Sequence, residues 1–228
     1  MPALTSESTA LRPLAWSRTR LLQLSLPALA VLLAGAWLMW ATGNHPPFQK
    51  FDDGWYQLMR SSRTPWLTDA NRVLDFVGND GMVIYSVLLL LVLLRRHWRL
   101  ALFTAVVNLC ALGLTHLIKF LVDRPRPSDH LVPVDHGSYP SGHVSGTVTA
   151  MVVTAVVLGR LWMWVSCAIL SVAMMYSRTY LGVHWASDTI AGALLGAGVT
   201  LLLWALLRDK CLGRNINHGS IEDGPQPL

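Results

Sequence analysis

Long apolar runs separated by short polar stretches dominate this sequence. The runs cover residues 21–41, 81–94, 100–122, 142–158, 161–175 and 189–207. Most approach the length of about 20 residues that crosses a bilayer as a helix. The pattern predicts an all-α polytopic membrane protein with six transmembrane helices. Residues 21–207 would form the membrane domain, between a polar N-terminal segment (1–20) and a polar tail (208–228). The first run is too long for a signal peptide, and no small-residue cleavage site follows it, so we interpret it as an uncleaved anchor.

The stretch 42–78 contains an amphipathic segment between the first two spans. Thr64-Pro65 is a good helix start, with a capping residue and then proline at the first helical position. Apolar residues follow at helical spacing: Trp66, Ala70, Val73, Leu74 and Val77. Gly78 fits the end of this helix. With Trp55 and Tyr56 nearby, the segment is expected to lie in the membrane interface. Two roles for this segment remain: a lid over a site, or a plain interfacial connector. The connector is the commoner role, because an apolar face on a helix usually serves only to be buried.

The composition agrees with a membrane protein. Hydrophobic residues make up 53% of the 228 residues and charged residues 14%, against about 25% charged in a typical soluble domain. The net charge of +5 does not indicate a nucleic-acid partner, because the basic residues sit at helix ends and in short loops. Cys110, Cys167 and Cys211 show neither a disulfide framework nor a metal-binding spacing.

The distribution of Lys and Arg predicts the orientation. One side would carry ten of these residues: Arg12, Arg18, Arg20, Arg95, Arg96, Arg99, Arg160, Arg208, Lys210 and Arg214. The other would carry eight: Lys50, Arg60, Arg63, Arg72, Lys119, Arg124, Arg126 and Arg178. Three of these eight belong to a candidate site, and most acidic residues share their side. The positive-inside rule then places the first side, and both termini, in the cytoplasm.

Candidate chemistry begins with residues 177–188, between the last two apolar runs. This stretch contains Arg178, His184 and Asp188, and a charge beside a membrane span is a functional-site hypothesis by default. On a helix, His184 and Asp188 would share a face. The carboxylate could then accept a hydrogen bond from one ring nitrogen and leave the other as a nucleophile. The alternative is a salt bridge at a helix start with an incidental histidine.

Two further polar clusters fall on the same predicted face. Residues 119–127 place Lys119 near the end of the third span and Arg126 beyond it, where Pro125 and Pro127 end the helix. Taken alone, this cluster also fits a snorkelling lysine and outward arginines. Residues 139–143 begin the fourth span, and a helix N-terminus favours a bound phosphate oxygen. An N-cap role would account for Ser141 and a turn for Gly142, but neither explains His143.

Together the clusters supply two histidines, several cations and a helix N-terminus. Cations and amides suit a transferring phosphoryl group, one histidine could attack phosphorus, and the other could protonate the leaving oxygen. A carboxylate cluster suited to a divalent metal is not evident, so a metal-free mechanism is the simpler interpretation.

These motifs resemble the three signatures of the type 2 phosphatidic acid phosphatase (PAP2) family. Residues 119–127 match K-x6-R-P, residues 139–143 contain P-S-G-H, and residues 177–188 match S-R-x5-H-x3-D. The motif region covers roughly residues 100–200. The resemblance implies a PAP2/haloperoxidase-like helical bundle. In it His184 would form a phosphohistidine, Asp188 would orient His184, and His143 would be the general acid. The phosphate-binding residues would be Lys119, Arg126, Ser141, Gly142 and Arg178. Arg124 and Asp123 lie at variable motif positions and receive no role.

The expected function is metal-independent hydrolysis of a lipid phosphate or diphosphate, without a cofactor. Undecaprenyl diphosphate or phosphatidylglycerophosphate would be the substrate type, and the expected location is the extracytoplasmic face of a bacterial inner membrane. A phosphotransferase that uses the same phosphohistidine is one alternative. A non-catalytic lipid transporter or scaffold is another. The partners would be the bilayer and its lipids, not nucleic acid; the sequence does not indicate an oligomeric state or a headgroup.

Overall fold

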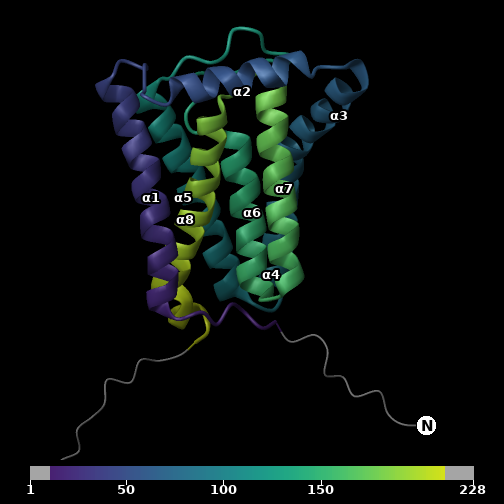
Figure 1. Cartoon of the computed structure of the whole chain (residues 1–228). Helices are drawn as coiled ribbons and strands as arrows, with labels where there is room; N and C mark the ends of the chain where they lie inside the picture. Colours follow the sequence, from purple (N-terminus) through teal and green to yellow (C-terminus); the bar gives the residue numbers. More distant parts are fainter. Residues whose placement is uncertain (1–10, 214–228) are drawn as a thin grey trace, which may run out of the picture.

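A computed structural model describes residues 11–213, and every regular element in that range is helical (Figure 1). The elements are α1 (Arg18–Ala41), α2 (Gln49–Ser61), α3 (Pro65–Phe76), the π-helical turn η1 (Val77–Gly81), α4 (Met82–Leu94), α5 (Trp98–Val122), α6 (Gly142–Leu158), α7 (Leu161–Tyr180) and α8 (Ala186–Cys211). The all-α prediction is confirmed. The outer parts of the predicted terminal segments, residues 1–10 and 214–228, lie outside the described residues.

Within residues 11–213, five helices are long and apolar enough to cross a membrane. Helix α6 is apolar but has only 17 residues, and almost all of them beyond its first turn are buried. A helix that is apolar on all sides belongs in the centre of a bundle. Counting α6, the bundle agrees with the six predicted spans.

The second span differs from its predicted boundaries. Helix α3 does not stop at Gly78 but continues through η1 into α4, so residues 65–94 form one span. Gly78 serves packing here, because a Cβ atom at this position would lie 2.5 Å from Met174 Cε. The predicted start after Thr64 is confirmed. The interfacial helix is instead α2, which carries Trp55 and Tyr56 and lies across one end of the bundle (Figure 1).

Helix α8 packs closely against α6 and α1 through glycines. A Cβ atom at Gly192 would lie 2.6 Å from Ser141 O, and one at Gly196 would lie 2.7 Å from Ser145 O. At Gly198 the nearest atoms belong to Leu29 of α1. Small residues let helix backbones approach in this way in membranes.

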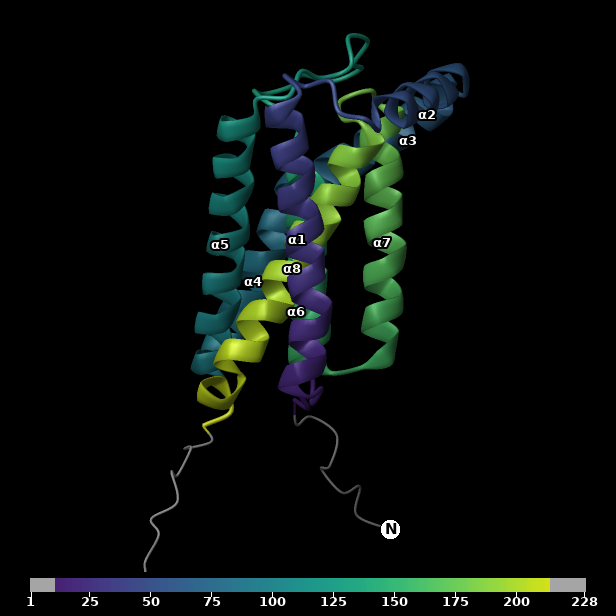
Figure 2. The same cartoon turned by 60° about the vertical axis from the view of Figure 1, so that its left-hand side comes forward.

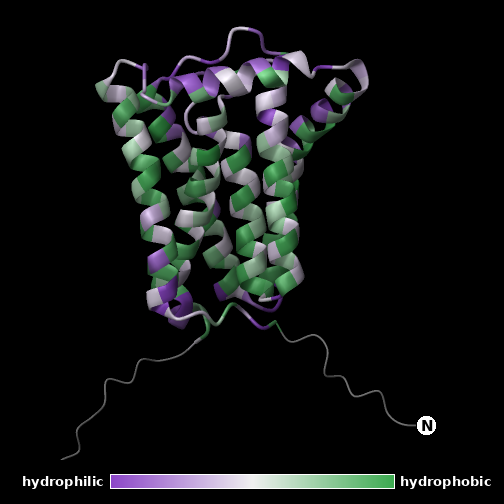
Figure 3. Cartoon of the chain, in the orientation of Figure 1, coloured by the Kyte–Doolittle hydropathy of each residue, from purple (hydrophilic) through white to green (hydrophobic). Residues whose placement is uncertain are grey.

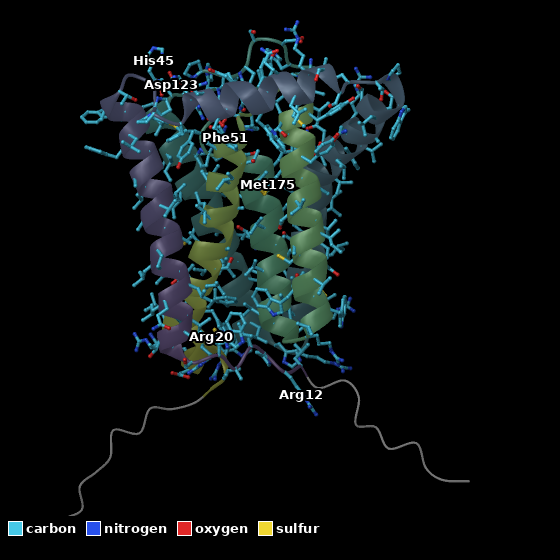
Figure 4. The ribbon with its side chains drawn as sticks, viewed as in Figure 1. Arg12, Arg20, His45, Phe51, Asp123 and Met175 are labelled. Carbon is cyan, nitrogen blue, oxygen red and sulfur yellow. The ribbon has the colours of Figure 1, made fainter. Side chains whose placement is uncertain are left out.

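Polar residues gather at the two ends of the bundle and apolar residues in its middle (Figure 3). The start of α1 and the end of α8 lie at the same end (Figures 1 and 2). Arg12 and Arg20 lie at that end, whereas His45 and Asp123 lie at the end where α2 crosses (Figure 4).

Candidate functional site

The three polar motifs meet at one cavity of about 660 Å³. Six of the eight predicted site residues line it: Lys119, Arg126, Gly142, His143, Arg178 and His184. The other two, Ser141 and Asp188, are fully buried and joined by a hydrogen bond of 3.0 Å from Ser141 N to Asp188 O. The structure therefore brings together side chains that lie up to 65 positions apart in the sequence, from Lys119 to His184.

His184 and Asp188 are neighbours, although not on one helix as the spacing suggested. Helix α8 begins at Ala186, so His184 lies in the preceding turn, and its Nδ1 atom is 3.6 Å from Asp188 Oδ2. That separation is slightly too long for a hydrogen bond. The same oxygen accepts a hydrogen bond of 2.9 Å from Trp185 N. The two side chains are adjacent as predicted, although the predicted hydrogen bond is not formed. A turn and the first turn of a helix bring them together.

Burial keeps the imidazole of His184 neutral. Only 4% of the residue is exposed, and burial lowers its pKa to about 4, although Asp188 favours the protonated form. On the other side of the ring, Nε2 lies 3.3 Å from Arg126 Nη1. Burial also lowers the pKa of Arg126, partly offset by Asp135. A neutral imidazole beside a guanidinium can present a lone pair next to a bound anion.

His143 has an acidic partner that the sequence did not indicate. Its Nε2 atom lies 3.1 Å from Asp75 Oδ1, and the same oxygen accepts a hydrogen bond of 2.5 Å from Arg178 Nη1. Asp75 comes from α3, where the sequence was interpreted as an interfacial segment. Once α3 is part of a span, a carboxylate in it is a functional-site signal.

The cations are fixed mainly through backbone carbonyls. Lys119 Nζ donates to Gly137 O at 2.6 Å, and Arg126 donates to Val183 O at 2.6 Å and Gly137 O at 3.0 Å. Arg126 also pairs with Asp135. Arg178 is buried, and its Nε and Nη2 atoms have no hydrogen-bond partner among the described residues. These arrangements leave positive charge directed at the cavity.

The start of α6 contributes backbone rather than a capping side chain. Ser141 occupies the N-cap position, but its buried hydroxyl makes no cap bond and has no partner among residues 11–213. Gly142 lines the cavity. A helix N-terminus leaves N–H groups without intrahelical partners, which suits a phosphate oxygen.

Arg124 is the second residue that the sequence reasoning missed. It was given no role, yet it is 1% exposed and donates a hydrogen bond of 2.7 Å to Asp188 Oδ1. The available signal was that residues 119–127 contain a third cation. Nothing within this motif distinguishes Arg124 from an arginine that points outward.

The cavity continues along the side of the bundle between α4 and α5. Val83 of α4 and Leu109 and Leu112 of α5 line it, and each is more than half exposed. The polar end of the cavity is thus joined to an apolar flank that faces outward. An amphipathic ligand with a charged head and an apolar chain matches this division.

Comparisons with known proteins place this site in context. A family model described as the PAP2 superfamily matches residues 96–211. The chain is 33% identical over 142 residues to an undecaprenyl-diphosphatase of Sulfolobus acidocaldarius, covering 58% of this chain and 68% of that protein. It is 36% identical over 110 residues to a decaprenylphosphoryl-5-phosphoribose phosphatase of Mycobacterium tuberculosis, covering 46% of this chain and 58% of that protein.

Two solved structures share the fold. A transmembrane PAP2-type phosphatidylglycerolphosphate phosphatase from Bacillus subtilis superposes with a TM-score of 0.63 at 21% identity, over 79% of this chain and 95% of that one. LpxE from Aquifex aeolicus superposes with a TM-score of 0.57 at 22% identity, over 65% of this chain and 91% of that one. At these identities the likeness concerns the fold alone.

Proposed function

This chain belongs to the PAP2 superfamily, and on that premise we propose that it hydrolyses a lipid phosphate or diphosphate through a phosphohistidine on His184. The convergence of all three motifs on one cavity is the observation that carries the proposal. The chain is an integral membrane protein and a phosphatase of this family; the substrate, the intermediate and the face of the membrane are parts of the proposal.

In the proposed first step, His184 Nε2 attacks phosphorus, and the bond from phosphorus to the leaving oxygen breaks. His143 gives its proton to that oxygen, so the lipid alcohol or lipid monophosphate leaves in its protonated form. In the second step, water attacks the phosphohistidine, His143 takes the proton from this water, and inorganic phosphate is released. Lys119, Arg126 and Arg178 would bind the phosphoryl oxygens, together with Gly142 N–H. Ser141, which is buried and does not line the cavity, would help to hold these phosphate-binding groups in place.

We expect the lipid part of the substrate to be a polyprenyl chain. The names of both relatives contain a polyprenyl group, undecaprenyl in one and decaprenylphosphoryl in the other. The cavity here continues into an apolar flank between α4 and α5. The phosphorylated head would lie among the cations while the chain extends along that flank. Undecaprenyl diphosphate is therefore the first substrate to test, and phosphatidylglycerophosphate the second.

Metal independence and the extracytoplasmic face complete the proposal. Within residues 11–213, no group of three His, Cys, Asp or Glu side chains is arranged to hold a metal ion, whereas three cations border the cavity. Asp123, which lies between the site residues Lys119 and Arg126 in the sequence, is at the end opposite Arg12 and Arg20 (Figure 4). The positive-inside rule would place those arginines in the cytoplasm.

The test is phosphate release by the purified protein in detergent, with undecaprenyl diphosphate as substrate. His184→Ala should reduce turnover by more than about 10³-fold, because it removes the proposed nucleophile. His97→Ala, a histidine change between α4 and α5, should leave turnover unchanged. The wild-type rate should also persist in EDTA. Release that survives His184→Ala would contradict the phosphohistidine, and release abolished by EDTA would contradict metal independence.

A further inference from the structure

A buried chain of charges connects the catalytic motif to the interfacial helix α2. Its centre is Arg124, which lies just beyond α5 and is 1% exposed. Moving an arginine out of water is costly unless its charge and donors are matched. Here they are matched by four side chains of α2 and α8: Gln49, Asp52, Ser187 and Asp188.

The two ends of the guanidinium face different helices. Nη1 donates to Asp188 Oδ1 at 2.7 Å and to Ser187 Oγ at 2.8 Å, both in α8. Nη2 donates to Asp52 Oδ2 at 2.8 Å and to Gln49 Oε1 at 2.7 Å, both in α2. Because the guanidinium is planar and its donors are fixed in a fork, it sets the position of one carboxylate relative to the other.

Asp52 fixes the same end of α8 a second time. It is fully buried; its Oδ1 atom accepts a hydrogen bond of 2.9 Å from Ser187 N, and its Oδ2 atom accepts one of 2.6 Å from Ser187 Oγ. Ser187 N is one of the first N–H groups of α8, which have no partner within the helix. A carboxylate there is favoured by the helix dipole.

Asp188 is therefore held at both oxygens. Arg124 holds Oδ1, and Trp185 N holds Oδ2, which is the oxygen that lies beside His184 Nδ1. Two fixed contacts define the orientation of the carboxylate, and the carboxylate faces the ring nitrogen opposite the one proposed to attack phosphorus. Small errors in such an orientation have large effects on rate, up to about 10²-fold for a displacement near 1 Å.

We propose that Arg124 and Asp52 are positioning residues for the phosphoryl-transfer step, acting on His184 through Asp188. The interfacial helix α2 is then part of the catalytic apparatus and not a plain connector. This inference rests on the proposed function, because it assigns the two residues to the step that His184 performs. Neither residue lines the cavity, so both would act without touching the substrate.

A tether for α2 exists independently of this chain of charges. Arg60 of α2 pairs with Asp129 at 3.0 Å, and Arg63 pairs with the same carboxylate at 2.9 Å. Both pairs join the α2 region to the loop between α5 and α6. The Arg60 pair is about half exposed, which makes it a matched control: it links the same segments but does not reach Asp188.

The experiment compares Arg124→Gln, Arg124→Lys and Asp52→Asn with the control Arg60→Gln. Each is purified in detergent and assayed with undecaprenyl diphosphate, next to wild type and His184→Ala. Arg124→Gln should lower kcat by about 10²-fold, with KM and inhibition by inorganic phosphate changed less than about threefold. Lysine cannot bridge two carboxylates with a planar fork, so Arg124→Lys should restore only a small part of the rate. Arg60→Gln should match wild type.

The pH dependence of kcat/KM separates positioning from a general loss of structure. His184 is faced by Asp188 from α8, by Arg126 from the loop and by Lys119 from α5, and none of these is changed. Removing the positive charge of Arg124 should let His184 take up a proton more readily, so the acid limb moves to higher pH. Asp52→Asn should move the acid limb the other way, because Arg124 then acts on Asp188 alone.

Several outcomes would overturn the inference. An unchanged kcat in both Arg124→Gln and Asp52→Asn would contradict it. Acid limbs of kcat/KM that stay at the wild-type pH in both variants would also contradict it. Equal losses in kcat and in phosphate inhibition would assign the two residues to folding alone. If Arg124→Gln does not purify as a single species, Asp52→Asn decides by the same criteria. If the wild-type protein itself released no phosphate, the proposed function would be rejected instead, so the two failures are distinguishable.

Discussion

At the scale of single residues, burial and charge pull in opposite directions around His184. The protein removes the ring from water, which disfavours the imidazolium, and places Asp188 beside it, which favours the imidazolium. Burial dominates, and the pKa falls to about 4. As the proposed nucleophile, His184 is therefore neutral over the whole physiological range, and its activation does not require the loss of a proton.

This balance predicts the acid side of the pH profile. A free imidazole would lose its lone pair around pH 6.5, whereas His184 should keep it until the pH approaches about 4. The acid limb of kcat/KM, which reports the free enzyme, should therefore lie below about pH 5. Measuring two lipid substrates whose phosphates titrate differently removes the substrate's own contribution. An acid limb near pH 6.5 that is identical for both substrates would contradict the burial argument.

The residues that sequence reasoning found and missed differ in one respect. His184, Asp188, His143 and the motif cations are recognised within short local patterns. Asp75 and Asp52 belong to no such pattern, because the residues they contact lie 68 positions away (His143) and 72 positions away (Arg124). Only the packing of α2 and α3 against the motif helices brings them to the site, and that packing cannot be derived from periodicity in either segment.

At the scale of elements, the glycines of α8 let its backbone approach that of α6 closely. Helix α6 carries His143 and α8 carries Asp188, and their backbones meet at Gly192 and Gly196. The apolar runs 142–158 and 189–207 predicted both helices. The course of α3 was harder to predict, because the π-helical turn at 77–81 interrupts the 3.6-residue repeat on which the pattern depends.

Replacing Gly196 with leucine should separate the two helices. A Cβ atom at this position would lie 2.7 Å from Ser145 O and 2.9 Å from Thr149 N, which are backbone atoms that cannot rotate away. Overpacking of this kind costs about 1–3 kcal/mol, so we expect a lower thermal unfolding midpoint in detergent together with reduced phosphate release.

Gly113→Leu provides the matched control for this change. No heavy atom beyond its neighbours lies within 4 Å of a Cβ atom at Gly113 in α5, so both the midpoint and the activity should remain close to wild type. If Gly196→Leu behaves like Gly113→Leu, the α6–α8 contact is more adaptable than the distances imply.

At the scale of the whole molecule, charge is distributed unevenly between the two ends. The α2 end holds most described acidic residues, and they pair with its cations, as in Arg124–Asp52, Arg178–Asp75 and Arg63–Asp129. The opposite end carries Arg12, Arg20 and the basic turn between α4 and α5, with Arg95 and Arg96. This basic end is the one that the positive-inside rule assigns to the cytoplasm.

Cysteine accessibility in intact cells tests this orientation. In a Cys211→Ser background, His45→Cys should react with a membrane-impermeant maleimide added from outside. Arg96→Cys should react only after the cells are permeabilised. Cys110, on the membrane-spanning α5, and the buried Cys167 should remain unlabelled in both cases. The reverse labelling pattern would place the cavity on the cytoplasmic face.

The flank between α4 and α5 has a further consequence for kinetics. A lipid that stays in the bilayer reaches an opening of this kind by diffusing sideways, so enzyme and substrate meet in two dimensions. Turnover should then follow the mole fraction of substrate in the membrane and not its bulk concentration. Diluting the substrate with inert lipid would slow the reaction even when the total amounts of enzyme and substrate stay constant.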